Sequence, residues 1–114
     1  MDKFTLLVEE ALDSLPKDFS KKLDNVAVTV EQEPSVEQRR KLNLPPWAIL
    51  FGLYEGISQT RRGNYSGVLP DKITIFKNSI EKVAGTDEEI KAQIRATVIH
   101  EIGHHFGLSD EDLS

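Results

Sequence analysis

The sequence predicts an α+β fold in which helices pack on a small mixed β-sheet. Apolar residues recur at helical spacing near both ends of the chain, and the middle holds alternating and continuous apolar runs typical of strands. In chain order, the predicted segments are α-β-α-β-β-α-α. The 114 residues, of which 39% are hydrophobic, suit one domain over residues 1–114 with a single core.

A helix over residues 4–15 and a strand over residues 25–32 are predicted first. The helix has apolar side chains three and four residues apart, and Pro16 ends it. The strand alternates in polarity, which is typical of a strand buried on one face. The apolar positions are Phe4, Leu7, Val8, Ala11, Leu12 and Leu15 in the helix and Val26, Val28 and Val30 in the strand.

A short helix and a buried strand are predicted next. Ser35 and Gln38 have the spacing of a capping box, so they begin a helix that ends near Asn43, before two prolines. The nearly continuous apolar run of residues 48–54 predicts a central strand that is buried on both faces. Trp47, directly before this run, is expected to anchor the core or its edge.

Residues 56–71 form a long polar segment. Loops longer than about a dozen residues are uncommon in compact domains, and they are usually functional or disordered. After this segment, residues 72–76 predict a strand and residues 78–84 a short helix, which Gly85 ends.

The last predicted helix covers residues 87–106. Thr86 and Glu89 form a second capping box at its start, and Gly107 suits the left-handed position at its end. On a helical wheel, His100 and His104 lie opposite an apolar stripe. The stripe consists of Ile90, Ile94, Val98, Ile102 and Phe106, with Ile99 at its edge.

His100, Glu101 and His104 form the pattern H-E-x-x-H within this helix. Positions i and i+4 lie about 40° apart around a helix and one turn apart along it, so two imidazoles there can converge on one tetrahedral zinc ion. Glu101 is offset around the helix from the two histidines. It can therefore act as the general base on a zinc-bound water without ligating the metal.

A catalytic zinc site needs a third protein ligand, and the residues after His104 offer one. A glycine at position 107 would end the helix and turn the chain back, so a side chain six residues after His104 can return to the metal. Asp110 occupies that position, and Glu111 and Asp112 are the alternatives. The same ligands could also hold a divalent ion other than zinc. His105 lies on the apolar side of the wheel and is interpreted as a packing or surface histidine.

The pattern H-E-x-x-H-x-x-G-x-x-D, which ends at Asp110, resembles that of the zincin metallopeptidases and is similar in spacing to the extended consensus of metzincins. Residues 50–56 and 65–76 resemble a family of very short bacterial zincin-like proteins. The resemblance covers the chain from about Glu33 onward. The sequence departs from metzincins because its only methionine, Met1, cannot form a methionine turn. Gluzincins take a third ligand from a later helix, and the four residues after Asp110 in the sequence are too few to predict one.

This resemblance implies a minimal zincin fold with its active-site helix near the C-terminus. It also implies His100 and His104 as zinc ligands, Glu101 as the base and Asp110 as the third ligand. In zincins, a substrate commonly extends along an edge strand above that helix.

Residues 72–76 are our expected edge strand, so Ile73, Thr74 and Ile75 are expected to bind substrate by strand addition. Tyr65 is a candidate oxyanion partner within the polar segment, together with Arg61, Arg62 and Asn64. The alternative is that these arginines are solvated charges and the tyrosine anchors the loop.

The sequence therefore predicts a zinc-dependent metallopeptidase that acts on a peptide or protein substrate. The alternative is a non-catalytic zinc-binding interaction module with a zincin fold, because little chain remains for specificity pockets. A nucleic-acid partner, and with it a ribonuclease, is disfavoured by the net charge of −5. There is no apolar run of about 18 residues, so no membrane partner is expected. The absence of cysteines and of an export signal predicts a cytoplasmic protein, whose oligomeric state stays open.

Overall fold

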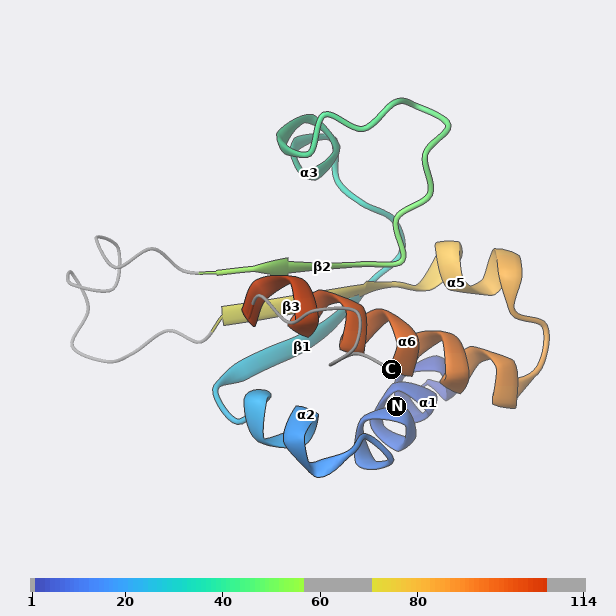
Figure 1. The fold of residues 1–114 in the computed structure, drawn as a ribbon. Helices are drawn as coiled ribbons and strands as arrows, with labels where there is room; N and C mark the ends of the chain where they lie inside the picture. The colour runs from blue at the N-terminus through green and yellow to red at the C-terminus, as the bar shows by residue number, and fades with distance from the viewer. Residues whose placement is uncertain (1, 57–70, 107–114) are drawn as a thin grey trace.

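A computed structural model describes residues 2–56 and 71–106, which form an α+β fold (Figure 1). The helices in these ranges are α1 (Lys3–Asp13), α2 (Lys17–Lys22), α3 (Val36–Lys41), α5 (Lys77–Val83) and α6 (Asp87–Phe106). The strands are β1 (Val26–Glu31), β2 (Gly52–Glu55) and β3 (Asp71–Phe76). The predicted fold class, with helices on a small mixed sheet, is confirmed.

The sheet has the strand order β1-β3-β2. β3 lies in the centre, parallel to β1 and antiparallel to β2, so that Ile73 is the partner of both Val28 and Tyr54. The prediction that residues 48–54 form a central strand is wrong, because only the end of that run pairs and β2 is an edge strand. Ile49, Leu50 and Phe51, the residues before Gly52, line a cavity against α6.

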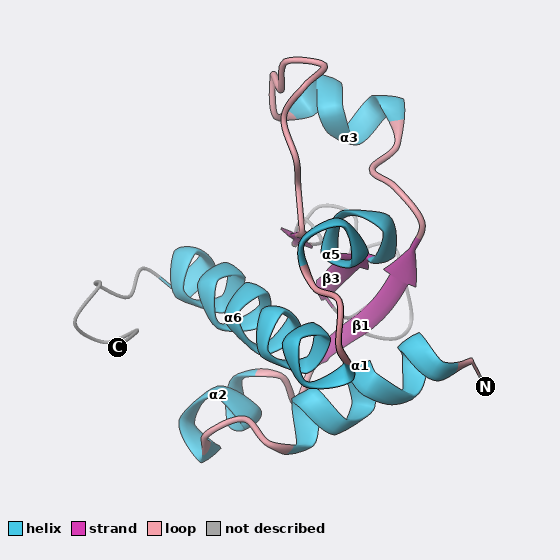
Figure 2. Cartoon of the chain, turned by 90° about the vertical axis from the view of Figure 1, so that its right-hand side faces the viewer, coloured by secondary structure: helices cyan, strands magenta, loops and turns pink. Residues whose placement is uncertain are grey.

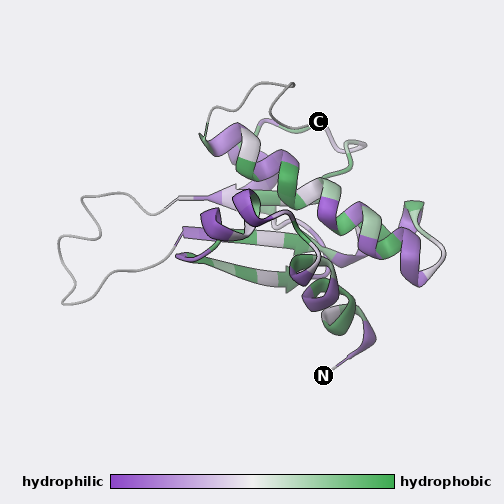
Figure 3. Cartoon of the chain, turned by 60° about the horizontal axis from the view of Figure 1, so that its bottom comes forward, coloured by the Kyte–Doolittle hydropathy of each residue, from purple (hydrophilic) through white to green (hydrophobic). Residues whose placement is uncertain are grey.

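Helices α1, α2 and α6 lie on one side of the sheet, and α3 stands on the other side (Figures 1 and 2). The core forms between α1, α6 and the facing side of the sheet. In Figure 3, hydrophobic bands on the strands lie beside hydrophobic bands on α6. The buried core cluster comprises Phe4, Val8, Ala11, Leu15, Ile73, Ile75, Ile80, Ala84, Ile94, Val98 and Ile102.

The predicted first helix is confirmed as α1, which begins after its N-cap residue, Asp2. The Asp2 carboxylate accepts a hydrogen bond from Thr5 N at 2.7 Å, so an otherwise unpaired backbone donor of the first turn is satisfied. Hydrogen bonding to Thr5 lowers the pKa of Asp2. The helix ends at Asp13 rather than Leu15, although Leu15 is buried beyond its end.

Helix α2 was not predicted, because Phe19 is the only large apolar residue within it and one such residue shows no periodicity. Its signals are electrostatic. Asp18 lies in the first turn and Lys21 and Lys22 in the last, an arrangement that complements the helix dipole.

The connection between β1 and β2 carries α3 away from the sheet (Figure 1). The capping box at its start is confirmed, since Ser35 Oγ accepts from Gln38 N at 3.0 Å and Gln38 Oε1 accepts from Ser35 N at 2.8 Å. Trp47 is 82% exposed, so its predicted role as a core anchor is wrong. It follows two prolines in this projecting connection, where no core is available to it.

Helix α6 buries most of its predicted stripe, because Ile94, Val98 and Ile102 are fully buried. Phe106 is 46% exposed, so the stripe was predicted one turn too long. The α6 members of the core cluster end at Ile102, and the last turn extends past that cluster. Within the described ranges, no helix combines the length and the hydropathy that crossing a bilayer would require.

Candidate functional site

Helix α6 fixes the direction in which the site residues point. Thr86 Oγ1 accepts from Glu89 N at 3.1 Å, and Glu89 Oε1 accepts from Thr86 N at 3.0 Å, so the predicted capping box is confirmed. The buried stripe sets the rotation of the helix against the sheet. The opposite face, which carries His100 and His104, is consequently exposed.

His100 and His104 lie one turn apart with their ring centroids separated by 4.1 Å and their planes tilted by 49°. The two imidazoles therefore occupy one small region of the helix surface, as their spacing predicts. Within residues 2–56 and 71–106, no third His, Asp or Glu joins them to form a metal-binding group. Asp110 and its alternatives, Glu111 and Asp112, lie outside the described residues, and so does Gly107.

Glu101 is held by the edge strand. Its Oε1 atom accepts a hydrogen bond from the backbone N–H of Tyr54 at 2.9 Å. Phe76 N donates to Phe51 O, so alternate residues of β2 direct their backbone groups away from β3, and Tyr54 is one of these. The Glu101 carboxylate therefore binds an N–H group on the edge of β2 that faces away from β3.

β2 and α6 run side by side in the same direction, and successive residues of β2 contact successive turns of α6. A Cβ atom placed on Gly52 would lie 2.6 Å from Thr97 Cγ2, and one placed on Gly56 would lie 3.8 Å from His105 Cε1. The Tyr54–Glu101 hydrogen bond lies between these two contacts. Two strand residues span about 6.6 Å and four helical residues about 6 Å. Every second residue of β2 therefore lies beside every fourth residue of α6.

A cluster of polar side chains surrounds the last turn of α6. The His105 ring stacks on Tyr54 with centroids 3.9 Å apart, and Tyr54 Oη donates to Asp71 Oδ2 at 2.8 Å. His105 Nε2 lies 3.8 Å from the same carboxylate oxygen. His105 is thus a surface-packing histidine, as predicted. Tyr54 and Asp71 were missed as site neighbours, because their proximity to α6 results from strand pairing and leaves no local pattern.

The predicted substrate-binding strand is incorrect. β3 is hydrogen-bonded to β1 on one side and β2 on the other, so it has no free edge over this region. Ile73, Thr74 and Ile75 are also fully buried. The prediction failed because it treated the apolar run of residues 48–54 as the sheet centre. Tyr65, together with Arg61, Arg62 and Asn64, lies outside the described residues.

A cavity of about 400 Å³ opens beside the histidine pair. It lies between the chain that leads into β2 and the outer face of α6, with His100 and Glu101 among its lining residues. The remaining lining residues are Ile49, Leu50, Phe51, Gly52, Gln93, Ala96 and Thr97.

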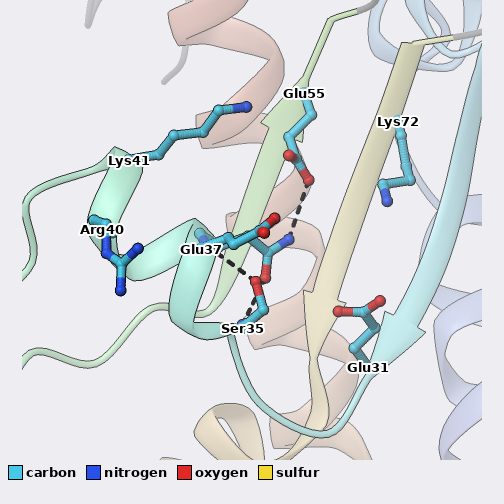
Figure 4. A pocket seen from close by; sticks show the side chains of 8 residues that line it. Glu31, Ser35, Glu37, Arg40, Lys41, Glu55 and Lys72 are labelled. Carbon is cyan, nitrogen blue, oxygen red and sulfur yellow. Dashed lines mark hydrogen bonds between the residues drawn. The ribbon is translucent and has the colours of Figure 1, made fainter.

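A larger cavity, of about 550 Å³, lies between α3 and the sheet. Figure 4 shows that its charged side chains come both from α3 and from the facing strands, with α6 behind the strands. Its lining includes the buried Gln38 of α3, whose Nε2 atom donates to Glu55 Oε1 of β2 at 3.1 Å. Neither His100 nor Glu101 lines this cavity, so it is separate from the histidine site.

Comparison with known proteins gives a family for the chain and a solved structure with a similar fold. Residues 23–114 match a family model described as zincin-like metallopeptidase, which is well over half of the chain. No curated protein matches the sequence. A solved structure, of a conserved hypothetical protein from Thermo thermophilus, is similar over 91% of each chain, with a TM-score of 0.56 and 24% identity. At that identity, the likeness establishes a shared fold.

Proposed function

We propose that this chain, which belongs to the zincin-like metallopeptidase family, is a zinc-dependent peptidase that hydrolyses peptide bonds. The observation that carries the proposal is a carboxylate fixed beside two paired imidazoles. His100 and His104 have ring centroids 4.1 Å apart on an exposed helix face, and Glu101 between them in sequence is anchored to Tyr54 N.

The donor set suits zinc. Imidazole and carboxylate groups are the usual ligands of catalytic zinc, which takes three protein ligands and keeps one position open. His100 and His104 supply two ligands, and Asp110 is proposed as the third, with Glu111 and Asp112 as alternatives. When bound, zinc would polarise a substrate carbonyl and lower the pKa of the attacking water.

Glu101 is proposed as the general base. The Tyr54 N–H group holds Oε1 at 2.9 Å, so Oε2 is the oxygen that would receive the proton of the attacking water. A hydrogen bond from the backbone restricts the rotation of the carboxylate and keeps it beside the imidazole pair. A positioned acid or base typically contributes roughly 10²–10⁴-fold to a rate.

We propose that substrate binds along the edge of β2 that faces away from β3, where no other described strand pairs. Gly52 and Tyr54 direct backbone groups to this edge, and both residues lie along α6 at the level of the site. Because Glu101 accepts from Tyr54 N–H, an incoming peptide would pair with the backbone of Gly52. Main-chain pairing of this kind supplies affinity that is independent of side-chain identity.

Metal analysis and a peptide screen together test the proposal. Purified protein is expected to hold about one zinc ion per chain, the stoichiometry of a single site. The loaded protein should cleave members of a mixed peptide library, and Glu101→Gln should lower the rate by roughly 10²–10⁴-fold while keeping the metal. Glu81→Gln, at an exposed position on α5, is the matched control and should match the parent.

Two results would contradict the proposal. Zinc-loaded protein that cleaves no peptide would leave a metal-binding interaction module as the function. Equal cleavage by the parent and by Glu101→Gln would remove Glu101 from the chemistry and would point to a contaminating peptidase.

A further inference from the structure

Trp47 is the most exposed of the large hydrophobic residues that the structure describes, with 82% of its surface open to solvent. It lies in the segment of residues 33–49, called here the α3 arm, which comprises α3 and the chain that leads from it toward β2 (Figures 1 and 2). Tryptophan is usually well buried, and where it is exposed on a folded protein it commonly anchors a partner.

The α3 arm is held in one conformation although no core supports it. Helix α3 ends in a Schellman motif, in which Leu44 N donates to Arg39 O at 3.0 Å and Asn43 N donates to Arg40 O at 3.1 Å. Asn43 takes the left-handed conformation that this motif requires, with φ at 55°. Asparagine is one of the few residues other than glycine that adopts it readily.

The turn that carries Trp47 is tied to this helix. Ala48 N donates to Pro45 O at 3.0 Å, and Arg39 Nη1 donates to Ala48 O at 3.2 Å. Trp47 is therefore presented from a backbone that is already ordered. A surface ordered in advance loses less conformational freedom when a partner binds.

A cavity of about 290 Å³ lies between the α3 arm and α5, and Trp47 lines it. This volume is at the lower end of the roughly 300–1,000 Å³ that is typical of small-molecule sites, so the cavity suits one large side chain. Neither His100 nor Glu101 lines it. The apolar lining residues are Pro34, Pro46, Trp47, Ala48 and Ile49.

The charges around this cavity favour an anionic partner. Arg39 and Lys82 line it, and within the described ranges neither cation lies within 4 Å of a carboxylate. Glu33 is the one lining carboxylate among the described residues, and its Oε1 atom accepts from Asn78 Nδ2 at 3.3 Å. Two cations against one carboxylate make this a locally basic site on a chain whose net charge is −5.

We propose that this cavity is a docking site for an extended segment of a partner protein, in which acidic residues flank a large apolar one. The apolar side chain would cover the Trp47 ring, and the flanking carboxylates would lie near Arg39 and Lys82. An anionic membrane offers similar chemistry, but the net charge of −5 opposes approach to an extended negative surface. The site goes beyond the proposed peptidase function and does not depend on it.

Fluorescence of the full-length protein tests the site directly, because Trp47 is the only tryptophan in the chain. The probes are capped pentapeptides with Phe or Ala in the middle. The middle residue is flanked by Asp and Glu, by Asn and Gln, or by two Lys. The acidic Phe peptide should shift the Trp47 emission to shorter wavelengths and should bind at least about tenfold more tightly than the acidic Ala peptide. Its affinity should fall as salt is added, and the Lys peptides should bind most weakly.

Trp47→Ala should weaken binding of the acidic Phe peptide by at least about 30-fold, as measured by calorimetry, because truncation of an interface anchor has effects of this size. Leu6→Ala is the matched control, since Leu6 is 48% exposed on α1, on the other side of the sheet. It should bind as the parent does. Both variants should keep the parent's circular dichroism spectrum, because both side chains are exposed.

Lys82→Glu should remove the preference for the acidic Phe peptide over its Asn and Gln counterpart. Lys21→Glu changes the net charge equally at an exposed position on α2, and it should keep the preference. Unchanged Trp47 emission with the acidic Phe peptide, or equal affinity for the acidic and Lys peptides, would overturn the proposal. An emission shift with phosphatidylserine vesicles but not with the peptide would also overturn it, and would assign the surface to a membrane.

Discussion

Gly52 and Thr97 approach so closely that a Cβ atom on the glycine would lie 2.6 Å from Thr97 Cγ2 and 3.1 Å from Thr74 O. The backbone of β2 at Gly52 therefore packs directly against the Thr97 side chain of α6. This contact sets the height of β2 above α6. It thereby brings the Tyr54 N–H group within 2.9 Å of Glu101 Oε1.

Gly52→Ala is expected to lower the free energy of unfolding by about 1–3 kcal/mol, because the added methyl group forces β2 away from α6. Urea unfolding measures the loss. Adding Thr97→Ser should restore part of it, since that change removes Cγ2 and keeps the hydroxyl that donates to Gln93 O. Gly85→Ala is the control, because its Cβ would meet Glu89 Oε1 at an ordinary 3.7 Å. Equal losses at the two glycines would contradict the close packing at Gly52.

Tyr54→Phe separates the backbone of Tyr54 from its side chain. The variant loses the hydrogen bond from Tyr54 Oη to Asp71, so its free energy of unfolding should fall by about 1–3 kcal/mol, since the acceptor is a carboxylate. The backbone N–H that holds Glu101 is unchanged, so peptide hydrolysis should stay within a few-fold of the parent. A drop as large as that of Glu101→Gln would place the hydroxyl group in the chemistry.

His104→Ala should abolish zinc binding, whereas the neighbouring His105→Ala should leave it near the parent value. His105 stacks on Tyr54 at a centroid distance of 3.9 Å, and His104 pairs with His100. Removing a ligand should cost more than the roughly 10–100-fold that loss of an outer hydrogen-bond partner costs. Competition with a chromophoric chelator measures both affinities, and equal losses would contradict the assignment of His104.

Asp110→Ala should weaken zinc binding by orders of magnitude more than Asp112→Ala, if Asp110 is the third ligand. The two residues lie two positions apart in the same acidic segment, so each substitution removes the same charge from the same region. The chelator competition distinguishes a ligand from a nearby charge. Equal effects would remove Asp110 from the site, and Glu111→Ala would be the next variant to measure.

Local features of this fold were predictable because they depend on neighbouring residues. The capping boxes at Ser35 and Thr86 involve positions three residues apart, and both form as predicted. The apolar stripe of α6 is likewise a property of helical spacing and is correct as far as Ile102. Helix α2 was missed because charge, not periodicity, marks it.

Strand order was not predictable in the same way. The pairing of Gly52 with Ile75 joins residues from separate segments, and an apolar run near residue 50 is compatible with either a central or an edge strand. Of the candidate site, only the part that lies within α6 was predictable. The spacing of His100 and His104 predicts that their rings lie close together, whereas the partner of Glu101 is a backbone N–H 47 residues away, which has no sequence signature.

Helix α6 follows every described strand in the chain, and its packing on α1 and the sheet has a consequence for biosynthesis. A nascent chain leaves the ribosome with its N-terminus first, so Ile73 and Ile75 emerge before residues 87–106 can cover them. Contacts between α1 and α6 close a long loop, which is a slow step in folding. The helix that completes the core also carries both imidazoles. A chain that has not finished folding therefore cannot present the histidine pair against the edge strand, so this arrangement forms only when the whole domain has been assembled.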